Sequence, residues 1–391
     1  PYPYQERLAL SDELPSLVAV PTGVGKTAAA VLAWLYRRRF AAESVRAATP
    51  RRLIYCLPMR TLVEQTASCV RRWLERLELN GEVGVELLLG GSEVGDWERT
   101  PERDCVLIGT QDMLLSRALN RGYGMSRYRW PVDFGLLNND SLWVIDETQL
   151  FGAGLPTTAQ LAGLRSKLGA YGANHTLWMS ATLDAKQLDT VDHPLSSVNR
   201  RLELNDDDRG APEVERLLTA PKPLRKHDLV LNSTTDKQYA AKMAAAVLEL
   251  HQAESITLVV VNRVLRARQI GGELGKLLHK KAASAPEVRI VHSRFRPADR
   301  QREQAAALDS STLSAAGRII VATQAIEAGV DISARTLITE LAPWASMVQR
   351  FGRCNRRGEF SADSAPAQVV WVDCDETNDK FALPYSARDL T

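Results

Sequence analysis

Residues 20–27 combine two glycines, a lysine and a threonine at a spacing that suits phosphate binding. The run reads Val-Pro-Thr-Gly-Val-Gly-Lys-Thr and follows an apolar segment. Glycine lets backbone N–H groups wrap a phosphate, Lys26 can reach the outer phosphates, and Thr27 can ligate Mg²⁺. The alternative is a glycine-rich turn between a strand and a helix. The context favours a nucleotide-binding loop, whose members are Thr22, Gly23, Val24, Gly25, Lys26 and Thr27.

Two adjacent acids follow another apolar run. Leu142–Ile145 has the composition of a buried strand, and Asp146 and Glu147 come directly after it. Beside a phosphate loop, Asp146 would hold Mg²⁺ and Glu147 would position and deprotonate an attacking water. The alternative is that both acids cap the next helix. A glutamate at this point favours hydrolysis over phosphoryl transfer to a small acceptor, because a kinase needs no activated water.

Arginines recur at three-residue steps near the end of the chain. The segment 349–358 reads Gln-Arg-Phe-Gly-Arg-Cys-Asn-Arg-Arg-Gly, which predicts a helix followed by a loop. Arg350 and Arg353 then share one helical face, and Arg356 lies just beyond it. Such arginines can reach a γ-phosphate and stabilise transition-state charge. Taken alone, the segment is more typical of a solvated basic loop, and the motifs around it favour the catalytic interpretation.

Short apolar runs alternate with helical patterns along the whole chain. Helical spacing at 26–39 and 61–79 separates runs that are apolar on both faces, as strands of a buried parallel sheet are. The alternation predicts a doubly wound α/β architecture. The expected strands lie at 17–20, 53–57, 85–89, 105–108, 142–145, 228–231, 256–261, 288–291, 318–321, 336–338 and 365–372.

A polar, proline-containing stretch interrupts this alternation at 191–223, with one further strand expected at 201–204. We therefore expect two α/β lobes of similar size, at 1–205 and 226–391. Residues 206–225 are the expected linker. A cleft between two such lobes is a natural ligand site.

Composition sets the limits of this interpretation. The chain has 391 residues, of which 45% are hydrophobic and 25% charged, and its formal net charge is +2. These values are those of an ordinary globular protein and exclude a disordered or collagen-like chain. No apolar run is long enough to span a membrane. The five cysteines form no CxxC pair, which predicts a reducing compartment, and we expect the cytoplasm.

The motifs resemble, in order and over nearly the whole chain, those of the superfamily-2 helicases. The resemblance implies two tandem RecA-like parallel-sheet lobes with a nucleotide cleft between them. Tyr4 and Gln5 resemble the adenine-reading segment, and Asp146–Gln149 reads Asp-Glu-Thr-Gln where Asp-Glu-Ala-Asp is commoner. The matching segments are Val20–Thr27 (motif I), 58–65 (Ia), 90–91 (Ib), 109–112 (Ic), 146–149 (II), 180–182 (III), 259–263 (IV), 321–331 (V) and 349–356 (VI).

Three phrases are more specific within that superfamily. His-Ser-Arg-Phe at 292–295, Thr-Gln-Ala-Ile-Glu-Ala-Gly at 323–329 and the arginine segment resemble the helicase portion of the type I CRISPR-associated helicase–nucleases. The resemblance implies ATP and Mg²⁺ as cofactors, and 3′-to-5′ movement on single-stranded DNA. It also implies a Cascade-like effector complex as partner. The six histidines are dispersed, so we expect the family's HD nuclease to lie outside these residues.

The resemblance also assigns site residues. Motif VI would place Gln349, Arg353 and Arg356 at the catalytic centre, and motif V would add Gly329 and Asp331 to the nucleotide site. The expected nucleic-acid contacts are Arg60, Thr61, Gly91, Thr110, Gln111, Asn262, His292, Arg294 and Thr323.

Some alternatives stay open. The basic and aromatic stretch 117–130 suits either strand binding or a packed surface loop. A DEAD-box RNA helicase and a non-catalytic ATP-gated clamp remain the rival functions.

Overall fold

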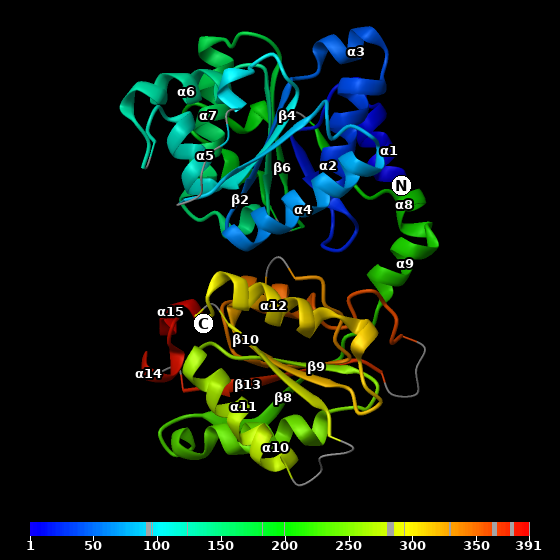
Figure 1. Ribbon diagram of the computed structural model, residues 1–391, viewed down its shortest axis with the longest axis vertical. Helices are drawn as coiled ribbons and strands as arrows, with labels where there is room; N and C mark the ends of the chain where they lie inside the picture. The colour runs from blue at the N-terminus through cyan, green and yellow to red at the C-terminus, as the bar shows by residue number, and fades with distance from the viewer. Residues whose placement is uncertain are drawn as a thin grey trace. The chain divides into compact units, whose positions relative to one another are not determined.

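The fold comes from a computed structural model, in which the chain forms two compact units, Pro1–Glu215 and Arg216–Thr391. Each unit has its own sheet with helices on both faces (Figure 1). No helix in the described part of the chain is long and apolar enough to cross a membrane. The structure describes residues 1–90, 95, 97–122, 124–181, 183–198, 200–279, 285–292, 294–327, 330–361, 366–375 and 379–390.

The first unit is built on a parallel sheet of seven strands in the order β3-β4-β2-β5-β6-β1-β7. Its inner strands are buried along most of their length, as the apolar runs predict. The strands are β1 Leu17–Ala19, β2 Arg52–Leu57, β3 Gly84–Leu88, β4 Cys105–Thr110, β5 Ser141–Asp146, β6 Asn174–Met179 and β7 Arg201–Glu203. The helices are α1 Pro3–Leu10, α2 Lys26–Leu35, α3 Glu43–Ala48, α4 Arg60–Arg76, α5 Gln111–Ala118, α6 Trp130–Asn138, α7 Gly154–Leu168, α8 Asp206–Gly210 and α9 Pro212–Thr219.

The second unit repeats this plan with six parallel strands in the order β10-β11-β9-β12-β13-β8. Its strands are β8 Leu224–Leu231, β9 Ile256–Val260, β10 Glu287–Val291, β11 Arg318–Ala322, β12 Thr336–Glu340 and β13 Gln368–Cys374. Its helices are α10 Tyr239–Leu250, α11 Val264–Leu278, α12 Pro297–Leu308, α13 Trp344–Phe351, α14 Asp379–Ala382 and α15 Ala387–Leu390. The predicted α/β class with two parallel-sheet lobes is confirmed.

The units divide inside the segment that was expected to be a linker. That segment contains α8 and α9, and α8 belongs to the first unit because Arg7 of α1 forms an ion pair with Asp208 at 2.7 Å. β6 was not among the expected strands. This strand lies between β5 and β1, but its first residues, Asn174-His175-Thr176, are polar, so it lacks the continuous apolar run expected of a buried strand.

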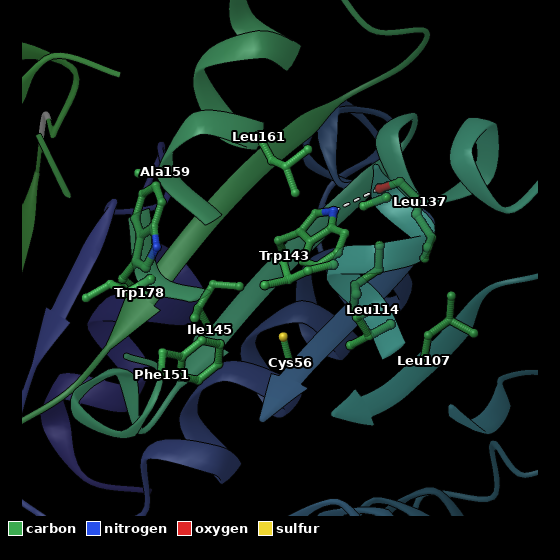
Figure 2. Close-up of a cluster of buried hydrophobic side chains, with 14 of the residues drawn as sticks. Cys56, Leu107, Leu114, Leu137, Trp143, Ile145, Phe151, Ala159, Leu161 and Trp178 are labelled. Atoms are coloured by element: carbon green, nitrogen blue, oxygen red, sulfur yellow. Dashed lines mark hydrogen bonds between the residues drawn. The ribbon is translucent and has the colours of Figure 1, made fainter. Parts of the chain in front are cut away.

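Large aromatic side chains fill the core of the first unit around β5 and β6 (Figure 2). Trp143 is 1% exposed, and its indole N–H donates to the carbonyl of Leu137 at 2.8 Å. Trp178 donates in the same way to the hydroxyl of Thr158 at 2.9 Å. Because both indole N–H groups donate a hydrogen bond, the two rings can be buried without leaving a donor unpaired. This packing fixes the strand that ends at Asp146.

Trp143→Ala should destabilise the first unit by about 3–5 kcal/mol, because it leaves a large cavity and removes the indole hydrogen bond to Leu137. Urea unfolding followed by circular dichroism would measure the loss. Tyr128→Ala is the matched control, since that ring is 93% exposed and should change stability by less than about 0.5 kcal/mol. Equal effects of the two substitutions would contradict the packing described.

Candidate functional site

Strand order brings the predicted nucleotide motifs together. β5, β6 and β1 are neighbours in a parallel sheet, so their carboxyl ends meet at one edge. The loop 20–27 follows β1, Asp146 ends β5, and Ser180 follows β6. This edge is where α/β folds bind their ligands.

The phosphate loop is held open by its glycines and fastened by α1. Gly23 and Gly25 have φ of +94° and +78°, a left-handed conformation that a larger residue adopts only with strain. The hydroxyl of Tyr4 donates to the carbonyl of Val24 at 2.7 Å, and the Gln5 amide donates to the carbonyl of Gly25 at 3.1 Å. Tyr4 and Gln5 therefore position the loop itself.

Lys26 is the first residue of α2, and its side chain gives the strongest indication that the loop binds a ligand. It is 6% exposed, and its ammonium finds no hydrogen-bond partner among the described residues. Burying an unpaired ammonium is costly, and a phosphate at the helix N-terminus would remove that cost. The residues present therefore fit the phosphates of a nucleotide.

Asp146 is buried beside this loop. It accepts hydrogen bonds from the Tyr55 hydroxyl at 2.7 Å and from the backbone N–H of Glu147 at 2.8 Å. The Thr27 side chain also lies near the Tyr55 hydroxyl, so both predicted metal ligands lie around one hydroxyl. Burial, and then the charge of Glu147, raise the pKa of Asp146 to about 6, although Lys26 opposes the shift. A desolvated carboxylate next to a hydroxyl is a suitable Mg²⁺ site.

Two side chains orient Glu147: Gln149, two residues further along the chain, and Ser180, which follows the neighbouring strand β6. The φ of Glu147, +55°, places the residue in the left-handed region, where a non-glycine residue is held only by its surroundings. The Gln149 amide donates to the Glu147 carboxylate at 2.6 Å, and the buried Ser180 hydroxyl donates to the Gln149 carbonyl at 2.9 Å. Gln149 thus joins two motifs within the first unit.

Gln149→Ala should lower kcat for ATP by roughly 10- to 100-fold and leave the KM for ATP nearly unchanged, because Glu147 loses its orientation and the phosphate loop is untouched. Steady-state ATP turnover with saturating nucleic acid would measure both constants. Gln187→Ala, at an exposed position of the same unit, serves as control. An unaltered kcat would show that Glu147 needs no such support.

Arg350 has a structural role in the second unit. Its side chain is fully buried and forms an ion pair with Glu327 at 2.7 Å. It also donates to Thr339 Oγ1, to the carbonyl of Glu340 and to Asn262 Oδ1, each at 2.9 Å. With its donors engaged in these bonds, Arg350 stabilises the ends of β9 and β12 rather than lying open to a phosphate.

The other arginines of the segment 349–358 lie just beyond α13. Arg353 is 6% exposed and donates to the carbonyl of Glu327 at 2.6 Å. Arg356 forms an ion pair with Asp331 at 3.1 Å, so two residues expected at the nucleotide are neighbours. Gln349 is buried on α13. Gly329 lies outside the described residues.

The expected strand contacts of the first unit occupy the other half of the same edge. β3, β4 and β2 are neighbours, and the residues after them are brought together. Arg60 is exposed and donates to the carbonyl of Gly90 at 3.4 Å, which joins the ends of β2 and β3. The residues at this half-edge are Arg60, Thr61, Thr110 and Gln111. Gly91 lies outside the described residues.

In the second unit the corresponding residues also follow adjacent strands, β10, β11 and β9. Arg294 is exposed, whereas His292, Thr323 and Asn262 are buried. The Asn262 side chain is already engaged, because its amide donates to the carbonyl of Leu341 at 2.7 Å and its oxygen accepts from Arg350. To donate to a nucleic-acid strand, the Asn262 amide would have to give up its hydrogen bond to Leu341.

The basic and aromatic stretch lies away from these edges, because α5 runs from the end of β4 toward the opposite side of the sheet. Arg121 and Arg127 each lie 5.9 Å from the Trp130 ring centroid, and Arg129 pairs with Glu98 at 2.6 Å. Trp130 is thus packed, as in a surface loop, whereas Tyr128 is 93% exposed and Tyr123 lies outside the described residues, so both alternatives stay open.

Comparison with known proteins gives two family matches. Residues 5–191 match the DEAD/DEAH box helicase family, and residues 253–359 match the C-terminal region of the CRISPR-associated nuclease/helicase Cas3. A putative CRISPR-associated nuclease/helicase Cas3 of Myxococcus xanthus is 26% identical, over 100% of this chain and 47% of its own length. The CRISPR-associated helicase Cas3 of Thermoproteus tenax is 32% identical, over 42% of this chain and 29% of its own length. The chain thus spans less than half of either relative.

Solved structures show the same fold. Cas3 of T. fusca with ATP has a TM-score of 0.66 at 18% identity, over 100% of this chain and 48% of its own. The DUF1998 helicase MrfA bound to DNA has a TM-score of 0.67 at 17% identity, over 97% of this chain and 50% of its own. These likenesses confirm the tandem RecA-like fold predicted from the motifs.

Proposed function

We propose that this chain, which matches the DEAD/DEAH box helicase family in its first part and the C-terminal region of Cas3 in its second, is a Cas3-type helicase motor. It would move 3′ to 5′ on single-stranded DNA in CRISPR type I interference and unwind it. The observation that supports this most directly is the nucleotide edge of the first unit. There Lys26 is buried beside Asp146 and a Glu147 held by Gln149, and its ammonium has no hydrogen-bond partner in the part of the chain that the structure describes. That arrangement suits hydrolysis of a nucleotide phosphate.

The first unit would bind and orient ATP. Lys26 and the N–H groups of residues 22–27 would hold the phosphates, and Thr27 and Asp146 would hold Mg²⁺. Mg²⁺ supplies charge neutralisation on the phosphates when it is bound. Glu147 would align a water with the terminal phosphate and accept its proton. Tyr4 and Gln5, which fix the loop, would also meet the adenine.

The second unit would complete the site. Arg353 and Arg356, with Gln349, would meet the terminal phosphate, and Asp331 and Gly329 would lie near the nucleotide. Arg356 would then leave its ion pair with Asp331, so nucleotide binding and the conformation of this segment would be coupled. Closing and opening of the two units would advance the strand.

The strand itself would be gripped by its backbone along the half-edges that carry Arg60 and Arg294. The proposed partners are single-stranded DNA, a Cascade-like effector complex and an HD nuclease supplied by residues outside this sequence. The five cysteines are all free, as suits the proposed cytoplasmic location.

The test is ATP turnover alone and with single-stranded DNA or RNA of matched length and sequence. Stimulation by DNA is the expected result. Stimulation by RNA alone would instead favour an RNA helicase of the DEAD-box kind, and turnover at background with either would favour an ATP-gated clamp. Unwinding of duplexes with only a 3′ or only a 5′ tail tests the direction, and we expect activity on the 3′-tailed substrate.

A further inference from the structure

A cleft of about 770 Å³ lies in the first unit, beside the amino ends of β1 and β6. Its lining includes Ser16, Gly163, Arg165, His175, Asp192 and His193. The lining runs along β6 from Asn174 to Trp178, which is two residues before Ser180.

Arg165, on α7, carries a positive charge that its surroundings do not balance. Its side chain is 92% buried, since 8% remains exposed, and it lies 5.2 Å from the Trp143 ring centroid. Its two terminal nitrogens donate to Asn138 Oδ1 at 3.1 Å and Thr176 Oγ1 at 2.9 Å. Both acceptors are neutral, and no ion pair to Arg165 occurs among the described residues. These bonds explain the position of the guanidinium but not the need for its charge.

Burying an uncompensated guanidinium costs free energy, and the loss of solvent lowers the pKa of Arg165 to about 9. Its Nε has no hydrogen-bond partner in the described part of the chain. A neutral side chain with two donors would make the same contacts at lower cost. An anion that enters the cleft would balance the charge.

The other charges of the cleft limit which anion fits. Lys167 pairs with Asp192 at 3.1 Å, so these two charges cancel. Burial lowers the pKa of His175, which keeps that ring neutral. The Arg165 guanidinium remains without an ion pair among the described residues, and it balances a single negative charge. The lining suits a single carboxylate better than a nucleic-acid backbone.

Exposed apolar side chains stand beside the lining residues. Leu168 follows Lys167 and is 82% exposed, Tyr171 is 88% exposed, and Val191 precedes Asp192 and is 93% exposed. Lys167 joins the two segments through the Val191 carbonyl at 3.4 Å. Exposed apolar groups next to a pocket that contains a buried polar group are typical of protein interfaces. We call these three side chains the apolar rim.

We propose that the cleft and its apolar rim dock a segment of a partner protein that presents one carboxylate side chain to Arg165 and apolar side chains to Leu168, Tyr171 and Val191. A free small acid could fill the cleft but could not cover the rim, which is why the occupant is a protein segment. The inference is independent of the proposed DNA substrate.

The test uses an array of capped hexapeptides that hold one Glu among Leu, Val and Phe, each matched by a peptide with Gln in place of Glu. Peptides that bind are then measured in solution by fluorescence polarisation. We expect a subset of Glu peptides to bind the whole chain at least about tenfold more tightly than their Gln partners. Acetate at the same concentration should not displace them.

Two variants assign the binding to this cleft. Leu168→Ser with Tyr171→Ser should weaken binding at least about tenfold without changing the melting temperature or ATP turnover, since both side chains are exposed. Leu277→Ser, 46% exposed on α11, is the matched control and should bind normally. Arg165→Gln keeps donors for Asn138 and Thr176, and should erase the preference for Glu over Gln.

Equal binding of Glu and Gln peptides, or binding that the rim variant leaves intact, would overturn the proposal. So would the absence of any binding peptide, or complete displacement by acetate. Self-association of the chain that the rim substitutions abolish would also overturn it, because the rim would then face a second copy. If Arg165→Gln fails to fold, the rim variant and the Glu/Gln comparison still decide the question.

Discussion

Glu147→Gln should lower ATP turnover by roughly 10²–10⁴-fold while ATP still binds, because an amide cannot accept the proton of the attacking water. The structure makes this substitution a clean one. Gln149 donates to a Glu147 carboxylate oxygen at 2.6 Å, and the amide oxygen of glutamine can accept the same bond. The orientation of residue 147 is therefore kept while its basicity is removed.

Single-turnover ATP hydrolysis with saturating DNA would measure the loss, and the affinity for a non-hydrolysable ATP analogue would show that the site is intact. Glu75→Gln on the exposed side of α4 is the matched control. Turnover of Glu147→Gln near the wild-type rate would place the general base elsewhere.

Asp146→Asn should have opposite effects on activity and on stability. The folded-state pKa of Asp146 is raised to about 6 from 3.8, so the native state prefers the protonated form. Its contribution to stability is complete below about pH 4 and is lost as the pH rises through about 6. At pH 8 the ionised carboxylate then costs on the order of 3 kcal/mol in the nucleotide-free protein. Asparagine removes that cost but cannot replace the charge that Mg²⁺ needs.

Thermal unfolding of the nucleotide-free protein between pH 4 and 8 would test this. The variant should melt at a higher temperature than the wild type at pH 8, with the difference shrinking toward pH 4, and its ATP turnover should be abolished. Asp207→Asn, exposed in the first turn of α8, should show neither effect. A lower melting temperature for Asp146→Asn at pH 8 would contradict the strain assigned to this carboxylate.

The strands were largely predictable from the sequence because strands of a parallel sheet are buried on both faces and read as continuous apolar runs. β6 escaped because its first half is polar: Asn174 and Thr176 hydrogen-bond other loops and helices at the amino edge. The phosphate loop and the Asp146–Glu147 pair were predictable because their function depends on contiguous residues.

Contacts between distant segments were not predictable in the same way. A helical period places Arg350 and Arg353 on one face but does not tell which of them is braced by Glu327 and Thr339. The role of Gln149 depends on the adjacency of β5 and β6, which only the folded sheet supplies. Asn262 was predicted as a strand contact from its motif, and its buried hydrogen bonds came from strand ends far along the chain.

We propose that one nucleotide is held by groups from both units, and Arg353 offers the most direct measurement of it. The affinity for ADP–aluminium fluoride, which mimics the transferring phosphate, would be compared with that for an ATP analogue in the wild type, Arg353→Ala and Arg353→Lys, all with DNA present. We expect Arg353→Ala to weaken binding of the transition-state mimic by about 10²-fold or more, with the ATP analogue nearly unaffected. Unchanged affinity for the mimic in a folded Arg353→Ala protein would contradict the account.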